Sequence, residues 1–180
     1  MRLLRGVSLA AALVLIGCVH SWRVADAGTE PPKEGFSLGQ RPPAFSVLDL
    51  KGQRQSLKQY RGQIVVLHFW ASWCPYCRGD IPKLLQIHEQ NSSQGVTILT
   101  VSIDHDIEQL KAFVQRAGLP YSVISDTRSE SSLADAYGVR GIPATYILDR
   151  DGRVAFQSTG SSDLVGAVAY LLEKSPAPAV

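Results

Sequence analysis

The apolar and polar positions of this chain follow strand-like and helix-like patterns in turn from about residue 45 onward. Two long apolar runs predict buried strands. One begins at Ile64, after Gly62, and reaches the tryptophans Trp70 and Trp73, and the other spans 96–103. Shorter β-rich runs predict an N-terminal hairpin, a further strand and a C-terminal hairpin, at residues 45–48 with 55–57, 121–124, and 145–148 with 154–156.

Helical patterns occupy the spaces between these strands. A helix is expected from Cys74 to about Gln90, and Asp106 is placed to cap a second helix that stops at Gly118. Further helices are predicted at 131–137 and 163–174.

The composition predicts one globular domain with a sizeable core, because 45% of the 180 residues are hydrophobic and 19% are charged. The formal net charge is only +2, and no basic run with interleaved aromatic residues occurs. We therefore expect no nucleic-acid partner.

The N-terminus has the pattern of a bacterial export signal. Arg2 and Arg5 precede an apolar segment, 7–16, which is too short for a membrane-spanning helix of about 20 residues. Residues 15–18 resemble a lipobox, in which Cys18 becomes the lipidated first residue of the mature protein. Cleavage after Ala27 and an uncleaved anchor are the alternatives.

The expected organisation follows from these boundaries. A signal peptide would cover 1–17, a linker 18–38, the folded domain 39–174 and a disordered tail 175–180.

Two cysteines separated by two residues follow the first long strand. Cys74 would lie at the N-terminus of the next helix, where unpaired N–H groups and the helix dipole favour a thiolate. We therefore expect Cys74 to be the nucleophile and Cys77 to be the resolving thiol that attacks the mixed disulfide. Pro75 suits the first helical turn, and Pro82 predicts a kink.

Other uses of the cysteine pair have less support. A structural zinc site needs four ligands, but the remaining cysteine is Cys18 and the four histidines show no paired spacing, so no metal is expected. A purely structural disulfide stays open, although a bridge across so short a loop constrains the unfolded chain little.

The motifs together resemble the thioredoxin superfamily. The resemblance rests on Trp73-Cys74-Pro75-Tyr76-Cys77, the helix proline Pro82, and Gly141-Ile142-Pro143-Ala144-Thr145. Segments 39–45, 69–73 and 77–82 are most similar to the extracytoplasmic TlpA/ResA/CcmG-like thiol-disulfide oxidoreductases. This similarity covers roughly residues 39–174, most of the mature chain.

The resemblance implies an α/β, thioredoxin-like fold. A central mixed β-sheet would be flanked by helices, with an added N-terminal hairpin and a central helix-strand insertion. It also implies a cis Ile142–Pro143 bond against the cysteine pair, with the backbone of Ile142 open to an extended substrate. No flavin or nicotinamide motif occurs, so no cofactor is expected.

Four further residues are supporting candidates for the site. His68 matches a buried aspartate of thioredoxin, and is either a proton carrier with a near-neutral pKa or a neutral core histidine with one hydrogen bond. Asp80 stands where many TlpA-like proteins have glutamate. It is either an acid that acts on the neighbouring thiols or a first-turn acid favoured by the helix dipole. Trp73 and Tyr76 are expected to form an apolar rim for the partner or simply to pack.

These features predict a membrane-tethered thiol-disulfide oxidoreductase in the periplasm or on the outer face of the cytoplasmic membrane. By resemblance it would reduce oxidised exported proteins, for example during cytochrome c maturation, and a membrane electron donor would re-reduce it. We expect a monomer. An oxidant or isomerase of disulfides and a copper-handling thiol chaperone stay open as alternatives. Peroxidase chemistry is a weaker option, because the cysteine context of the related peroxiredoxins differs.

Overall fold

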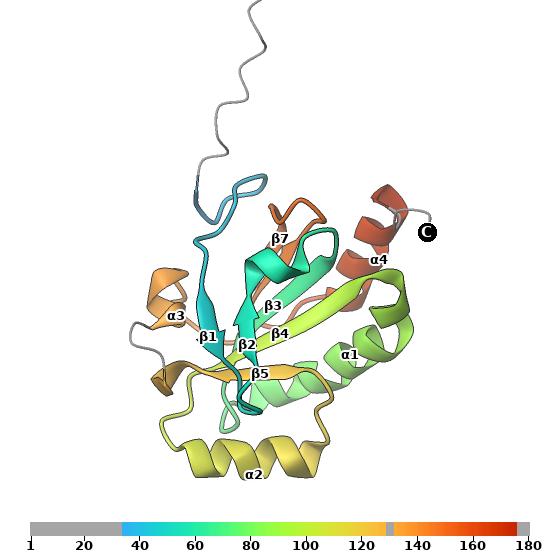
Figure 1. Ribbon diagram of the computed structural model, residues 1–180. Helices are drawn as coiled ribbons and strands as arrows, with labels where there is room; N and C mark the ends of the chain where they lie inside the picture. The colour runs from blue at the N-terminus through green and yellow to red at the C-terminus, as the bar shows by residue number, and fades with distance from the viewer. Residues whose placement is uncertain (1–33, 129–131, 176–180) are drawn as a thin grey trace, which may run out of the picture. The chain divides into compact units, whose positions relative to one another are not determined.

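The computed structural model describes residues 34–128 and 132–175 (Figure 1). The expected signal peptide 1–17, the lipidation site Cys18 and most of the linker 18–38 lie outside these residues, as does nearly all of the tail. Within the two described ranges, none of the helices has both the length and the apolar character needed to cross a membrane.

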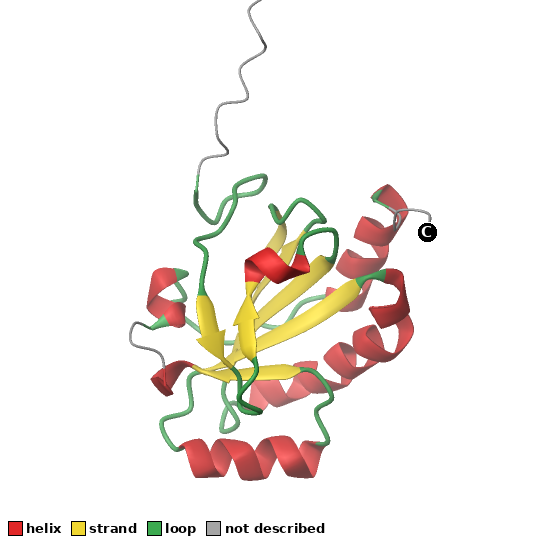
Figure 2. Ribbon diagram, in the orientation of Figure 1, coloured by secondary structure: helices red, strands yellow, loops and turns green. Residues whose placement is uncertain are grey.

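A five-stranded mixed sheet forms the centre of the fold, in the order β5-β4-β3-β6-β7 (Figures 1 and 2). Strand β3 runs parallel to β4, and β4 parallel to β5, whereas β6 is antiparallel to both β3 and β7. This confirms the expected mixed sheet. The strand bounds are β3 Ile64–Trp70, β4 Val96–Ser102, β5 Ser122–Ser125, β6 Ala144–Leu148 and β7 Val154–Thr159.

Four helices cover this sheet. Their bounds are α1 Pro75–Asn91, α2 Ile107–Ala117, α3 Leu133–Ala136 and α4 Leu164–Lys174. Short 3-10 segments add Leu57–Tyr60, Ser92–Gln94 and Asp126–Arg128. Pro82 lies inside α1, which continues for nine residues beyond it, and the expected kink stays a prediction.

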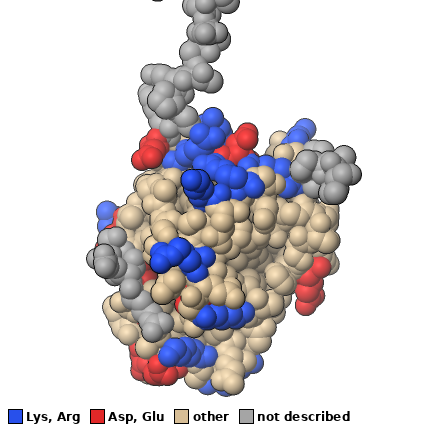
Figure 3. Space-filling model, viewed as in Figure 1, with Lys and Arg blue, Asp and Glu red and all other residues tan. Residues whose placement is uncertain are grey.

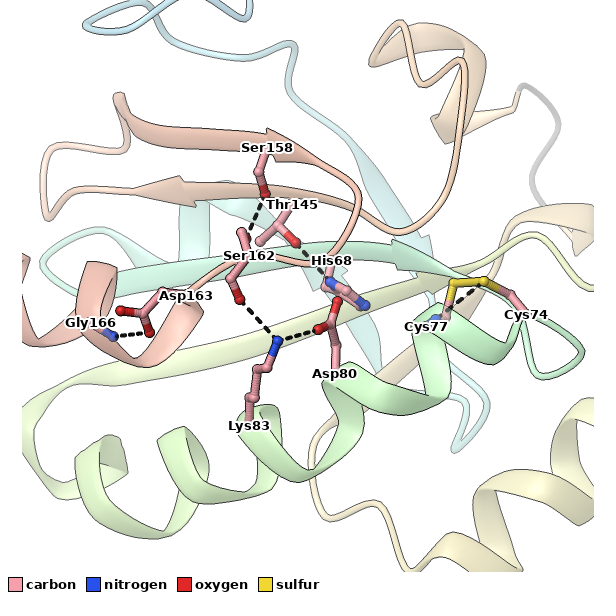
Figure 4. A network of polar contacts seen from close by, with 10 residues as sticks. All are labelled: His68, Cys74, Cys77, Asp80, Lys83, Thr145, Ser158, Ser162, Asp163 and Gly166. Carbon is pink, nitrogen blue, oxygen red and sulfur yellow. Dashed lines mark hydrogen bonds and ion pairs between the residues drawn. A yellow bond between two sulfur atoms is a disulfide. The ribbon is translucent and has the colours of Figure 1, made fainter.

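Alternate side chains of β3 enter two different cores, as the period of a strand requires. One core includes Ile64 and Trp70 and is completed by residues of α1, α2 and α4. The other includes Val65 and Phe69 and is completed by α3 and the N-terminal hairpin. His68 is an even number of residues away from both Ile64 and Trp70, so its side chain lies on the same face of β3, which α1 covers (Figure 4).

The predicted N-terminal hairpin is present and consists of β1 Ser46–Leu48 paired antiparallel with β2 Arg54–Ser56. Its turn is attached to the edge strand β5. Asp49 bridges Ile124, and the Leu50 amide donates to the Val123 carbonyl at 2.8 Å. The hairpin therefore adds a second layer at one edge of the sheet instead of extending the sheet.

The expected helix signals of α2 are confirmed. The side chain of Asp106 accepts hydrogen bonds from the amides of Glu108 and Gln109, at 2.9 and 3.1 Å. Gly118 ends the helix with a φ of 61°, a left-handed conformation that glycine adopts at little cost.

Arginines gather at the end of the sheet where β3 begins, and Figure 3 shows the largest group of Lys and Arg at one end of the face, with others scattered over the rest of it. Arg41 and Arg61 both donate to the carbonyl of Asp151, in the turn between β6 and β7. Arg150 donates to the carbonyl of Gly62, just before β3, at 2.8 Å. These bonds tie the β6–β7 turn to the start of β3, and Cys74 follows the opposite end of that strand.

Candidate active site

Cys74 and Cys77 form a disulfide at the N-terminus of α1 (Figure 4), with their Cα atoms 5.2 Å apart. Cys74 is the N-cap residue, and its Sγ atom accepts the Cys77 amide at 3.2 Å. Pro75 begins the helix, as predicted. Cys74 is 5% exposed and Cys77 is fully buried, so Cys74 is the more exposed of the two residues.

The loop before Cys74 is fixed by a carboxylate that sequence reasoning missed. Asp104 is 3% exposed and accepts hydrogen bonds from the Ser72 amide at 2.8 Å and the Ser72 hydroxyl at 2.6 Å. It also accepts the hydroxyl of Ser102, at the end of β4. The sequence did offer a signal for Asp104, namely its position just after a predicted buried strand, because polar residues at the ends of parallel strands commonly line functional sites.

Two large aromatic side chains flank the disulfide and are open to solvent. Trp73 is 60% exposed and Tyr76 is 74% exposed. They are among the few large apolar side chains in the described residues that are not packed, so they contribute little to the core. Exposed aromatics beside a reactive centre are suited to contacting a partner.

The Ile142–Pro143 bond is cis, as expected from the resemblance. Pro143 is buried and directly precedes β6, where Ala144 pairs with Phe69 of β3. This register places Pro143 beside the end of β3 that leads to Cys74. Ile142 is half-buried and packs against the cluster that contains both cysteines.

His68 is neutral at pH 7. Its side chain is 1% exposed, and Nδ1 lies 2.8 Å from the Thr145 hydroxyl, whereas Nε2 has no hydrogen-bond partner. Burial lowers the pKa of His68 to about 4, although the charge of Asp80 acts in the opposite direction. The near-neutral pKa on which the proton-carrier reading relied is therefore absent from the folded protein.

Asp80 lies on the buried face of α1 together with Cys77. It is 1% exposed, and its Oδ1 atom is 2.8 Å from the Nζ atom of Lys83, which also donates to the Ser162 carbonyl at 3.0 Å. No acidic residue occupies the first turn of α1, so the reading of Asp80 as a first-turn acid is wrong. The side chain instead points inward because the sixth helical position faces the sheet.

The fold thus brings Cys77, His68 and Asp80 to one side of α1, as Figure 4 shows. Sequence reasoning missed Lys83, Thr145 and Ser162, which complete the group of polar side chains. The three-residue spacing of Asp80 and Lys83 was a usable signal for an ion pair. The contact between His68 and Thr145 depends on the β3–β6 register, and the Lys83–Ser162 contact on the approach of the loop before α4. No sequence pattern reports either.

No grouping of three or more His, Cys, Asp or Glu side chains suited to a metal ion occurs in the described residues. The chemistry that this arrangement can perform is thiol-disulfide exchange. One sulfur is held at a helix N-terminus, a second sulfur lies behind it in the core, and a carboxylate follows one turn later.

The fold and site define a thioredoxin-like thiol-disulfide oxidoreductase. Residues 38–157 match the AhpC/TSA family, and the chain belongs to that family. It is 32% identical over 129 residues to the thiol-disulfide oxidoreductase ResA of Geobacillus thermodenitrificans, covering 72% of this chain and 73% of the relative. It is 31% identical over 152 residues to ResA of Geobacillus kaustophilus, covering 84% and 85%.

A comparison with a solved structure also finds a similarity to a disulfide-exchange protein. The solution structure of a thiol:disulfide interchange protein from Bacteroides sp. matches with a TM-score of 0.67 and 26% identity, over 77% of this chain and 91% of that one. Both the sequence and the fold therefore support disulfide exchange.

Because His68 is neutral when folded and titrates near 6.5 when unfolded, the unfolded chain binds one more proton between about pH 6.5 and pH 4. Stability should therefore fall by up to about 3 kcal/mol as the pH drops through this window, from this residue alone. The His68→Asn variant should lose this part of the slope in urea unfolding measured from pH 4 to 7.

His105→Asn is the matched control, since His105 is exposed. It should keep the wild-type slope. Identical pH slopes for the wild type and His68→Asn would contradict the assignment, whatever the absolute stability of the variant.

Proposed function

We propose that this protein is a membrane-tethered reductase of disulfides in exported proteins, acting on the outer face of the cytoplasmic membrane or in the periplasm. The export pattern of residues 1–18 supports this location. The similarity to ResA supports the chemistry. The reduction of haem-binding cysteines during cytochrome c maturation is the proposed physiological setting.

In the proposed reaction, the Cys74 thiolate attacks one sulfur of the partner disulfide and releases the other as a thiolate. The single N–H donor of Cys77 and the helix N-terminus stabilise the attacking thiolate. Cys77 then attacks the Sγ atom of Cys74, which releases the second partner sulfur and forms the Cys74–Cys77 disulfide. Two electrons pass from the dithiol to the partner.

The direction of electron flow rests on one observation, the burial of Cys77 and Asp80 on the same face of α1. A fully buried thiol resists ionisation because of desolvation, and a buried carboxylate one helical turn away adds charge repulsion. The reduced dithiol is therefore poorly stabilised relative to the disulfide. Strongly oxidising members of the fold behave in the opposite way, because their reduced form is stabilised.

The partner would dock over the exposed side chains of Trp73 and Tyr76. An extended segment of it would pair with the backbone at Ile142, next to the buried Pro143. A membrane protein would return electrons to Cys74 and Cys77, since the compartment is oxidising and the chain has no cofactor motif. The protein would act as a monomer.

The equilibrium reduction potential of the Cys74–Cys77 pair tests the direction. In glutathione or dithiothreitol buffers we expect a value of about −220 mV or lower. A value near −120 mV would refute the reductant and make disulfide formation the better description.

Cysteine substitutions test the order of attack. Cys74→Ser should reduce disulfide-reductase turnover to the background rate. Cys77→Ser should accumulate a mixed disulfide at Cys74 in one-to-one stoichiometry, visible by non-reducing electrophoresis and mass spectrometry.

Cys18→Ser is the control for these variants. It should keep full turnover in detergent while the protein leaves the membrane fraction of cells. Unchanged steady-state turnover in Cys77→Ser would remove the resolving role from Cys77.

A further inference from the structure

The turn between β3 and α1 is held by the loop that follows β4. These two strands are parallel neighbours, and their last paired residues are Trp70 and Ser102. The pairing continues one step further, because the Ile103 amide donates to the Trp70 carbonyl at 2.9 Å. Ser72 and Asp104 each follow the last pair by two residues, so the strand register brings these two residues together.

Asp104 binds Ser72 at two points. Its Oδ2 atom accepts the Ser72 amide at 2.8 Å, and its Oδ1 atom accepts the Ser72 hydroxyl at 2.6 Å. Oδ2 also accepts the hydroxyl of Ser102 at 2.6 Å. Hydrogen bonds to a carboxylate are stronger than those between neutral groups, and two of them fix both the main chain and the side chain of Ser72. Ser72 is therefore held in one position relative to β4.

This position is passed on to Cys74 through the main chain. The Cys74 amide donates to the Ala71 carbonyl at 3.2 Å, which closes a four-residue turn, 71–74, with Ser72 at its second position. Cys74 then caps α1, and its Sγ atom accepts the Cys77 amide at 3.2 Å. The bonds between Asp104 and Ser72 thus restrain the turn that places the reactive sulfur.

We propose that Ser72 is a positioning residue for Cys74, which binds Asp104, fixes the turn 71–74 and so keeps the Cys74 thiolate on the Cys77 amide. The proposal rests on the proposed function, in which this thiolate attacks the partner disulfide. An N–H group stabilises a thiolate only while the sulfur stays within hydrogen-bond reach, and a loose turn lets the sulfur move away. The Ser72 hydroxyl binds Asp104 and not a sulfur atom, so it acts through the main chain.

Alkylation by iodoacetamide measures the thiolate directly, because the thiolate forms a bond to carbon and releases iodide, whereas the thiol is unreactive. The rate at Cys74 is followed by peptide mass spectrometry from pH 5 to 10, in the reduced full-length protein carrying Cys18→Ser. In Ser72→Ala, the midpoint of the pH profile should rise by about one unit, so the rate well below the midpoint falls by about tenfold. At pH 10 the two rates should agree within about twofold.

The Ser72→Ala substitution changes no charge near Cys74. The elements that meet at the turn carry these other ionisable side chains: Tyr76, Cys77 and Arg78 on α1, Asp104 and His105 after β4, and Arg140 before the cis peptide bond. All of them are retained in the variant. A shifted profile therefore reports the position of the sulfur and not a lost charge.

Two controls isolate the contact between Ser72 and Asp104. Ser72→Thr keeps both the hydroxyl and the amide and should retain the wild-type midpoint within about 0.3 unit. Ser102→Ala removes a hydrogen bond of equal length to the same carboxylate, but outside the turn. It should lower the free energy of unfolding in urea and leave the Cys74 profile unchanged.

A second measurement does not depend on the folding of any variant. In the reduced wild-type protein, the Ser72 and Cys77 amides should exchange hydrogen at least about tenfold more slowly than the Trp73 amide, which has no hydrogen-bond acceptor in the described residues. An unprotected Ser72 amide would overturn the proposal.

The alkylation profiles can contradict the proposal as well. A wild-type profile in folded Ser72→Ala would overturn it, and so would an equal shift in Ser102→Ala. Failure of the wild-type protein to reduce protein disulfides would instead refute the proposed function, and the alkylation profiles would still decide the role of Ser72.

Discussion

The fold depends on the complete burial of β3. All seven of its residues are buried, with hydrogen-bonded neighbours on both sides and packed cores on both faces. A shift of one residue in its register would exchange the two faces and place apolar side chains in the wrong core. Because the strand is fixed in this way, the loop that follows it delivers Cys74 to one position at the start of α1.

The same burial means that ionisable side chains beneath the disulfide must be either neutral or paired with an opposite charge. His68 on β3 and Asp80 on α1 face each other in a region from which water is excluded. His68 remains neutral at pH 7, and the ammonium of Lys83 balances the negative charge of Asp80. An exposed pair such as Lys111–Glu108 contributes little to stability, since water already solvates both charges.

The two cysteines occupy different surroundings although they are three residues apart. Cys74 lies at the edge of the core beside the exposed Trp73 and Tyr76, whereas Cys77 has no exposed surface. This asymmetry assigns one sulfur to the partner and the other to the interior. This asymmetry arises from the helix, because a residue at the N-cap and a residue one turn later face different environments.

The sequence by itself determined the local elements and the reactive pair. Apolar runs marked β3 and β4, Asp106 and Gly118 marked the ends of α2, and the spacing of Cys74 and Cys77 marked a redox motif, since each of these signals is carried by neighbouring residues. Only the tertiary structure decided the state of the polar groups. The pKa of His68 depends on its burial among β3, β6 and α1, and the charge balance of Asp80 on a lysine that a loop about 80 residues away also holds. Those quantities arise from contacts between distant segments, which no local pattern encodes.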